Sequence, residues 1–255
     1  MKRRPVYYNE WDKYAAAWLR ELIKAKLIPE GEVDERDIRE VKAKDLKKFT
    51  QCHFFAGIGG WAYALQIARW SDAHVWTGSC PCQPWSFGGE KQGFADERHL
   101  WPDWFELIRQ CKPSDVLGEQ VVGAIKLGWF DQVITDLESQ NYAVGGAVLA
   151  ANDFGADHER KRLFWGANSS GPRWKRFKPN DRISRSAQKA QSVIDNIFAR
   201  ARRALDGDFS GLLHSDGISV QVERDAIKCY GNAFVPQACA EFIKAYKDSK
   251  KEIEC

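Results

Sequence analysis

The feature that most constrains the fold is a glycine-rich turn between an apolar segment and an amphipathic one. The apolar segment, residues 51–55, runs directly into Ala56-Gly57-Ile58-Gly59-Gly60, and apolar side chains then recur at helical spacing from Trp61 to Ala68. A strand, a tight turn and a helix in this order form the unit that binds nucleotides in open α/β sheets. A turn that serves only close packing would have the same glycines, so the pattern by itself does not establish a ligand.

The same alternation of strand and helix patterns continues along the chain. The predicted elements are strands at 5–8, 33–38, 74–77, 115–117 and 143–150 and helices at 15–23, 101–110 and 129–139. Strands that alternate with helices of these lengths predict an α/β domain with a largely parallel sheet.

Composition narrows the class of protein. Of the 255 residues, 44% are hydrophobic and 29% are charged, as in an ordinary globular domain. The longest stretch without charged or strongly polar residues, 142–151, is too short to cross a bilayer, and residues 5–10 lack the apolar run of a signal peptide. Seven scattered cysteines, an odd number, favour free thiols in a reducing compartment. We therefore expect a soluble, cytoplasmic protein.

Positive charge is concentrated in one part of the chain. The formal net charge is only +3, but residues 168–206 contain ten Lys or Arg and three Asp or Glu. This stretch also has helical apolar spacing at 187–205, which predicts one long helix that packs against the core. The basic excess is either a contact surface for a polyanion or a solvated basic face.

A cysteine between two prolines follows the strand at 74–77. Cys82 lies in Pro81-Cys82-Gln83-Pro84, at a strand end where open sheets bind ligands, and the prolines stiffen the loop. Cys80 and Cys82 could bind a metal, but no second pair of Cys or His lies nearby, so we expect no metal site. A nicotinamide site would need an acidic residue after this strand, where the chain has Gly78 and Ser79.

Five ordered segments resemble the motifs of DNA (cytosine-5) methyltransferases. They are FFAGIGG (54–60), PCQ (81–83), GEQV (118–121), HERKR (158–162) and YGNA (230–233). The segment at 91–98 is similar to the one that follows the family's catalytic loop, and the resemblance covers nearly the whole chain outside 167–217. It implies a Rossmann-like, doubly wound, mostly parallel sheet that binds S-adenosylmethionine, with a small DNA-recognition lobe.

Two further motifs stand in an unusual place. Residues 9–15 resemble the family's acidic cofactor motif and residues 34–38 its Asp-Ile motif, which the family usually places between the glycine turn and the Pro-Cys loop. We predict that this strand–helix–strand unit has moved to the front of the chain but keeps its place in the sheet. The strand at Tyr7–Tyr8 should then lie beside 51–55, and Glu10 should reach the pocket of Gly57. The alternative is an ordinary amphipathic N-terminal extension.

The resemblance implies roles for four catalytic residues. Cys82 would attack C6 of a cytosine, and Glu119 would hold a proton near N3 of the base. Arg162 would bond the cytosine O2, and Arg160 would support the site and a phosphate.

The resemblance also implies a binding site for S-adenosylmethionine. Phe55 would stack on the adenine and Trp11 would cover its other face, while Glu10 would bond the ribose hydroxyls. Asp37 would bond the adenine amino group, and Asn232 would lie near the methionine end. The remaining cofactor-binding residues would be Ala56, Gly57, Ile58, Gly59, Gly60, Ile38 and Pro81.

Double-stranded DNA is the implied partner. Ser86 resembles a phosphate-contact position, and further DNA contacts are expected from Arg173, Lys175, Arg176 and Lys178. The expected organisation is a catalytic domain at 1–166, a basic target-recognition segment at 167–217, and a return to the catalytic domain at 218–255. Compactness and motif order suggest a bacterial or phage restriction-modification context.

Three positions depart from the family pattern. Gln120 stands where the family usually has Asn, His158 replaces a usual Gln, and His53 replaces a usual Asp. The alternatives to a DNA methyltransferase are a non-catalytic DNA-binding relative, a cytosine-5 methyltransferase that acts on RNA, and a nicotinamide oxidoreductase, which would rest on the glycine turn alone.

Overall fold

A mostly parallel sheet organises the described part of the chain. The computed structural model describes residues 6–81, 100–154, 159–169 and 234–251, which contain a seven-stranded sheet of order β2-β1-β3-β4-β5-β7-β6. The strands from β2 to β5 pair in parallel, and β7 runs antiparallel to both of its neighbours. The strands are β1 (Val6–Asn9), β2 (Gly31–Asp34), β3 (Gln51–Phe54), β4 (Val75–Gly78), β5 (Asp115–Val121), β6 (Ala143–Ala150) and β7 (Lys161–Asn168).

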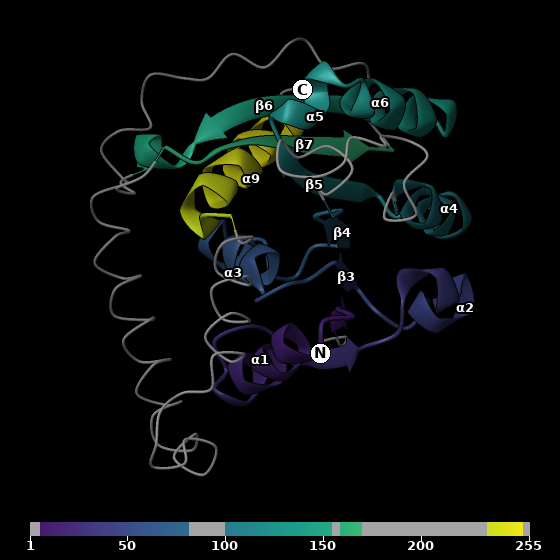
Figure 1. Cartoon of the computed structure of the whole chain (residues 1–255), viewed down its shortest axis with the longest axis vertical. Coiled ribbons are helices and arrows are strands. Elements are labelled where there is room, and N and C mark those ends of the chain that lie inside the picture. Colours follow the sequence, from purple (N-terminus) through teal and green to yellow (C-terminus); the bar gives the residue numbers. More distant parts are fainter. Residues whose placement is uncertain (1–5, 82–99, 155–158, 170–233, 252–255) are drawn as a thin grey trace.

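Helices cover both faces of this sheet (Figure 1). One face carries α1 (Lys13–Lys24), α3 (Gly60–Ile67) and α9 (Pro236–Lys251). The other carries α2 (Ala43–Leu46), α4 (Trp101–Cys111), α5 (Gly123–Lys126) and α6 (Trp129–Ser139). Two short 3₁₀ turns, η1 (Ile38–Glu40) and η3 (Ala151–Phe154), follow β2 and β6. The predicted doubly wound α/β fold is confirmed.

The moved strand–helix–strand unit keeps the place that was predicted for it. β1 lies between β2 and β3, with Tyr8 opposite His53 in the parallel register. α1 connects β1 to β2; the Asp12 side chain caps its first turn by accepting hydrogen bonds from the N–H groups of Tyr14 and Ala15. The strand at Tyr7–Tyr8 therefore lies beside the strand of the glycine turn.

Two indole rings pack beneath the carboxyl edge of the sheet. Trp104 of α4 covers Gly78 at the end of β4, where an added Cβ would lie 2.6 Å from the ring. Trp165 of β7 covers Gly118 of β5 at 2.1 Å from the corresponding position. The ring centroids are 5.8 Å apart. The two indoles and the two strand glycines therefore pack directly below Ser79 and Glu119, the residues that follow these glycines.

The main difference from the prediction is β7, which the sequence patterns did not indicate as a strand. Its last six residues, 163–168, are buried, and they pack into the cores on both faces of the sheet. Because both faces are covered, polar and apolar side chains do not alternate along β7, and the usual sequence signal of a strand is missing. Boundaries differ at two other strands. β2 ends at Asp34 rather than at Ile38, because Asp37 caps η1, and β5 continues to Val121, so Glu119 lies inside the strand. The long helix predicted at 187–205 lies outside the described residues.

Candidate active site

The carboxyl ends of the parallel strands bring distant side chains to one edge of the sheet. Glu10 follows β1, Phe55 follows β3, Ser79 follows β4, and Glu119 lies near the end of β5. This edge is where open α/β sheets bind ligands.

The glycine turn and Glu10 meet directly. The Gly57 N–H donates a 2.7 Å hydrogen bond to Oε2 of Glu10, and the Asp12 N–H donates one of 2.8 Å to Oε1. Gly57 and Gly59 have φ of +54° and +82°, and a Cβ added to Gly57 would meet no atom within 4 Å. The turn therefore has the left-handed backbone that favours glycine, and at Gly57 it borders open space rather than packed side chains.

Two aromatic residues accompany this turn. Phe55 is in the left-handed region, with φ of 50°, and its ring meets Trp104 edge to face at 6.2 Å. Trp11, next to Glu10, has 69% of its surface exposed. A large exposed indole beside an open turn is a surface on which a planar group can stack.

Glu119 and Arg162 form an ion pair at the same edge. Arg162 Nε lies 2.8 Å from Glu119 Oε1, and the carboxylate is almost fully buried. Burial raises the pKa of Glu119, although the charges of Arg162 and Arg160 and a hydrogen bond with Ser79 oppose it. The antiparallel register of β5 and β7, which pairs Val121 with Arg162, brings these residues together.

The segment that leads to the Pro-Cys loop is attached to β5. Gln120 Nε2 donates to the Cys80 carbonyl at 3.4 Å, and Gln120 Oε1 accepts from the Val121 N–H at 2.8 Å. Trp61 Nε1 donates to Ser79 Oγ at 3.1 Å. The Gln120 side chain thus links β5 to the backbone two residues before Cys82.

One described thiol, that of Cys80, lies near this edge. Cys80 is buried, and burial raises its pKa well above the usual value, with further contributions from Asp103 and Glu119. A thiol in these surroundings stays protonated and is a poor nucleophile. Among the described cysteines, Cys52, Cys80, Cys111 and Cys239 are free thiols.

His53 has a packing role in β3. It is buried, its Nδ1 lies 2.7 Å from Thr77 Oγ1, and its ring stacks on Tyr8 at 5.2 Å. Burial lowers the pKa of His53 to about 3, so the ring is neutral at physiological pH.

Some of the other site residues predicted from the sequence are described by the structure, and some are not. Asp37 caps η1 by accepting from the Arg39 N–H at 2.9 Å, Ile38 is buried in the core, and Pro81 follows Cys80 after β4. The others lie outside the described residues: Cys82, Ser86, His158, Arg173, Lys175, Arg176, Lys178 and Asn232.

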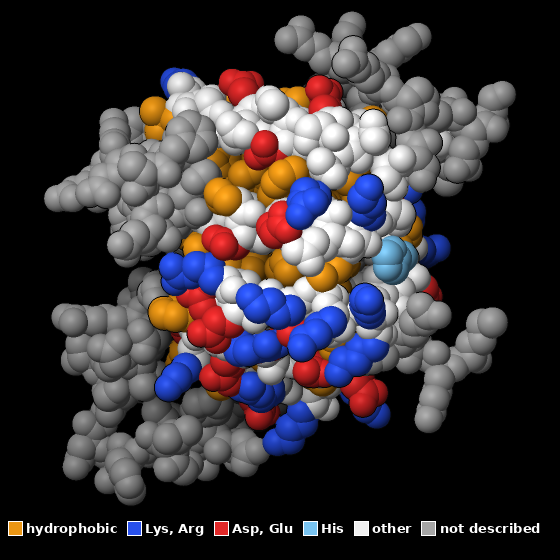
Figure 2. All heavy atoms as spheres, turned by 90° about the vertical axis from the view of Figure 1, so that its right-hand side faces the viewer, with side chains coloured by type: hydrophobic (Ala, Val, Ile, Leu, Met, Phe, Trp, Pro, Cys, Tyr) orange, Lys and Arg blue, Asp and Glu red, His pale blue; other side chains and the backbone are white. Residues whose placement is uncertain are grey.

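Positive charge also gathers on the side of the molecule where α2 lies (Figure 2). The segment that connects β2 to β3 exposes six cations and has four acidic residues. The six are Arg36, Arg39, Lys42, Lys44, Lys47 and Lys48. Within the described ranges, no group of His, Cys, Asp and Glu could hold a metal ion, and no helix is both long and apolar enough to span a bilayer.

Parts of the chain are similar in sequence to known proteins. The Type II methyltransferase M.HgiCII of Herpetosiphon aurantiacus is 30% identical over 127 residues, which are 47% of this chain and 28% of the relative. M.SsoII of Shigella sonnei is 28% identical over 163 residues (62% of this chain, 35% of the relative), and M.NlaX of Neisseria lactamica is 30% identical over 137 residues (50% and 44%). The chain thus spans less than half the length of these curated relatives.

The chain is also similar to a solved structure and to a family model. A crystal structure of a Spodoptera frugiperda DNMT2 variant aligns with 69% of this chain and 45% of its own, with a TM-score of 0.46 and 17% identity. The model of the family described as C-5 cytosine-specific DNA methylase matches residues 2–216. Because that match covers most of the 255 residues, the chain belongs to the family of C-5 cytosine-specific DNA methylases.

Proposed function

We propose that this protein transfers a methyl group from S-adenosylmethionine to C5 of a cytosine in double-stranded DNA, through a transient bond between Cys82 and C6 of the base. The observation that carries the proposal is the buried Glu119–Arg162 pair, which lies at the carboxyl edge of the sheet beside the segment that leads to Cys82. Family membership supports the reaction class.

The residues at this edge suit the electronic demands of the reaction. Cytosine C5 is a weak nucleophile until a thiolate adds to C6 and converts the ring into an enamine. Addition places negative charge on the base, and a proton held near N3 relieves it. Because burial raises the pKa of Glu119, its carboxyl group retains a proton at higher pH than an exposed one and can serve as this donor.

Arg162 and Arg160 complete the site for the base. The guanidinium of Arg162 is held by Glu119, and its remaining N–H groups are donors suited to the cytosine O2. Arg160 lowers the pKa of Glu119 by its charge, so it too lies near the carboxylate and can support it or a nearby phosphate. Burial raises the pKa of the Cys80 thiol and makes it a poor nucleophile, which supports the assignment of this role to Cys82.

The residues around the glycine turn fit the methyl donor. Glu10 is a carboxylate fixed by two backbone N–H groups, which suits recognition of ribose hydroxyls. The space over Gly57 and the exposed Trp11 suit a flat nucleoside next to Phe55, and Asp37 and Asn232 complete the assignment. When bound, S-adenosylmethionine supplies an electrophilic methyl group.

Access to the base requires DNA to be held and opened. C6 of a stacked cytosine is out of reach of a thiol, so the base must leave the helix. Contacts to phosphates hold the strand during this step. We assign this role to Ser86, which follows Cys82 in the sequence, and to Arg173, Lys175, Arg176 and Lys178 of the basic segment. The exposed cations of the segment between β2 and β3 add to the positive charge available.

Trapping on 5-fluorocytosine tests the chemistry. With S-adenosylmethionine present, the wild-type protein should form a stable covalent adduct with duplex DNA that carries the fluorinated base. Release of the thiol requires removal of a proton from C5, and fluorine at that position blocks this step. Cys82→Ser should abolish the adduct, and Cys80→Ser is the matched control that should retain it. An adduct that survives Cys82→Ser, or none with the wild type on any duplex, would contradict the proposal.

Bisulfite sequencing of DNA from cells that express the protein identifies the target. We expect protected cytosines within one short sequence, and none with the Cys82→Ser variant. Methyl transfer to tRNA but not to duplex DNA would instead support the RNA alternative.

A further inference from the structure

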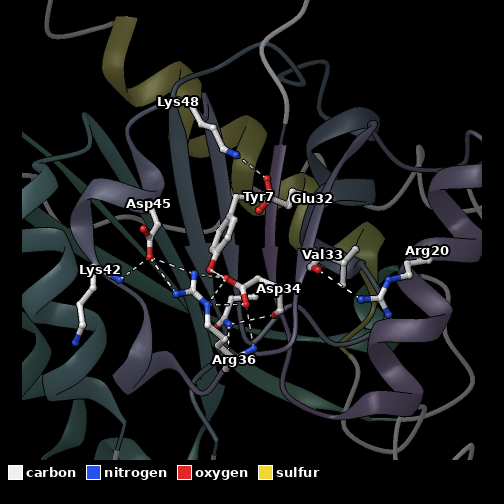
Figure 3. A network of polar contacts seen from close by, with 10 residues as sticks. Tyr7, Arg20, Glu32, Val33, Asp34, Arg36, Lys42, Asp45 and Lys48 are labelled. Atoms are coloured by element: carbon white, nitrogen blue, oxygen red, sulfur yellow. Dashed lines mark hydrogen bonds and ion pairs between the residues drawn. The ribbon is translucent and has the colours of Figure 1, made fainter.

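A polar network closes the turn that follows β2 (Figure 3). Tyr7 of β1 donates from its hydroxyl to Asp34 Oδ2 at 2.7 Å. Arg36 reaches the same oxygen with Nη2 at 2.6 Å, and its Nη1 and Nη2 each lie 3.1 Å from Asp45 Oδ2 on α2. One guanidinium therefore joins the end of β2 to the helix that leads into β3.

The acceptors of Asp34 are fully used within this network. Besides Tyr7 and Arg36 Nη2, its carboxylate accepts from the Arg36 N–H at 3.0 Å and from Arg36 Nε at 3.1 and 3.0 Å. A carboxylate has about four lone-pair positions, so Asp34 has no capacity left for a ligand. Its contribution is to fix Arg36.

The turn is also held from the β1 side. Asn9, which is buried at the end of β1, donates from Nδ2 to the Arg36 carbonyl at 2.8 Å and to the Asp34 carbonyl at 3.3 Å. Both the side chain and the backbone of Arg36 are therefore fixed, immediately before Asp37.

Asp37, unlike Asp34, has a carboxylate oxygen that can accept a further hydrogen bond. Its Oδ1 accepts from the Arg39 N–H and from Arg39 Nε, each at 2.9 Å, whereas its Oδ2 accepts from Arg39 Nη2 at 2.6 Å. Since a carboxylate oxygen can accept two hydrogen bonds, Oδ2 can take one more donor. The loop that carries Asp37 is closed at its two ends by the Arg36–Asp45 ion pair.

We propose that Arg36, fixed by Asp34 and Asp45, is a positioning residue that holds Asp37 so that its Oδ2 selects the exocyclic amino group of the donor's adenine. The inference rests on the proposed function, because it assumes that the donor binds at this edge of the sheet. It assigns the adenine selectivity of the protein to a network that does not itself touch the donor.

Two compounds whose bases differ at the exocyclic group, and with it in the proton on N1, test the inference. S-Adenosylhomocysteine has the amino group, and S-inosylhomocysteine has an oxygen there, which a carboxylate would repel. By isothermal titration calorimetry, we expect the wild-type protein to favour the adenosine compound by about tenfold or more, the worth of one hydrogen bond to a charged group. Arg36→Met should bring the ratio of the two dissociation constants close to one.

Milder and matched variants separate positioning from stability. Arg36→Lys keeps the charge but cannot bridge both carboxylates, and Tyr7→Phe removes one hydrogen bond, so both should give intermediate ratios. Lys48→Gln is the control, because it breaks an exposed 2.8 Å ion pair with Glu32 in the same part of the molecule without touching the turn (Figure 3). It should keep the wild-type ratio. Thermal unfolding of each variant shows whether it is folded.

The outcomes are distinct. Equal weakening of both compounds by Arg36→Met, with the ratio preserved, would show a purely structural role and overturn the inference. A wild-type protein that binds both compounds equally would overturn it as well, while leaving the donor site in place. A wild-type protein that binds neither would overturn the proposed function together with the inference.

Discussion

The amide N–H of Gly57 donates a 2.7 Å hydrogen bond to Glu10 Oε2 although 47 positions separate the two residues. The bond joins the turn after β3 to the first residue after β1, and these strands pair in parallel. In this chain the unit that carries Glu10 precedes the glycine turn, so the pairing of strands, rather than chain order, places the carboxylate. A connection from β2 back to β3 need cross no other connection of the sheet.

Replacing Glu10 should weaken donor binding. Glu10→Gln keeps an oxygen that can accept from the Gly57 N–H but removes the negative charge. We expect the dissociation constant of S-adenosylmethionine to rise about tenfold to a hundredfold, since hydrogen bonds to charged groups contribute about 1.5–3 kcal/mol. Calorimetric titration measures this change.

The control for Glu10 lies nearby on the surface. Glu30 is exposed just before β2, and Glu30→Gln should leave the dissociation constant unchanged. Equal effects of both substitutions would show that overall charge, rather than the contact with the turn, matters.

The burial of Glu119 should appear in the pH dependence of stability. Burial raises its pKa in the folded protein above the ordinary value of 4.5, despite the opposing charge of Arg162. The folded state therefore holds the proton more tightly than the unfolded state, and the stability this gives is lost as pH rises from about 4.5 through the raised pKa. Relative to Glu119→Gln, the wild-type free energy of unfolding should fall over this range, as measured by urea unfolding.

A second carboxyl group provides the comparison for Glu119. Glu159 is exposed and pairs with Lys161, so Glu159→Gln removes a surface carboxyl group without touching the buried pair and is the control for Glu119→Gln. A constant difference between wild type and Glu119→Gln from pH 4.5 upward would contradict the expected pKa shift.

His53 should give the opposite dependence. Burial lowers its pKa from 6.5 to about 3, so below pH 6.5 the unfolded chain takes up a proton that the folded protein does not. The free energy of unfolding should then fall by up to about 1.4 kcal/mol per pH unit as the pH decreases from 6.5 toward 3. His53→Gln should remove this component in urea unfolding, whereas His74→Gln, at an exposed position, should not.

The C-terminal helix depends on a buried carboxylate. Asp115 at the start of β5 accepts from Lys250 Nζ at 2.7 Å, from the Tyr246 hydroxyl at 2.6 Å and from Asn168 Nδ2 at 2.8 Å. Lys250→Met leaves the charge without its cation and should lower the free energy of unfolding by about 2 kcal/mol, a value reduced for the partial exposure of the lysine. Lys244→Met on the same helix breaks an exposed pair with Glu241 and should cost about 0.5 kcal/mol or less.

The sequence predicted best those helices and strands whose bounds depend on their own residue pattern alone. The helix at 129–139 and the strand at 143–150 were predicted to the residue, because each has clear periodicity and ends at a turn. The place of Glu10 followed from its motif. The Glu119–Arg162 contact could not be derived from local patterns, because it depends on β7, whose apolar run has neither strand nor helix periodicity. The Arg36 network was also missed, because it joins β1, β2 and α2 through side chains.

Gly118 should be among the positions least tolerant of substitution, because its neighbour is a ring rather than a flexible chain. A Cβ there would lie 2.1 Å from Trp165, which is fully buried against Trp101 and Trp104, so the indole has no space to withdraw. Gly118→Ala should therefore lower the free energy of unfolding by about 3 kcal/mol, at the upper end of overpacking costs. Gly128→Ala is the comparison: φ is +80° but a Cβ meets nothing within 4 Å, so only the backbone cost of about 1 kcal/mol remains.

Because Glu119 follows Gly118 directly, a shifted indole would also displace the carboxylate, and adduct formation on 5-fluorocytosine should slow in Gly118→Ala while Gly128→Ala retains the wild-type rate. Equal costs for the two variants would mean that the indole of Trp165 moves freely.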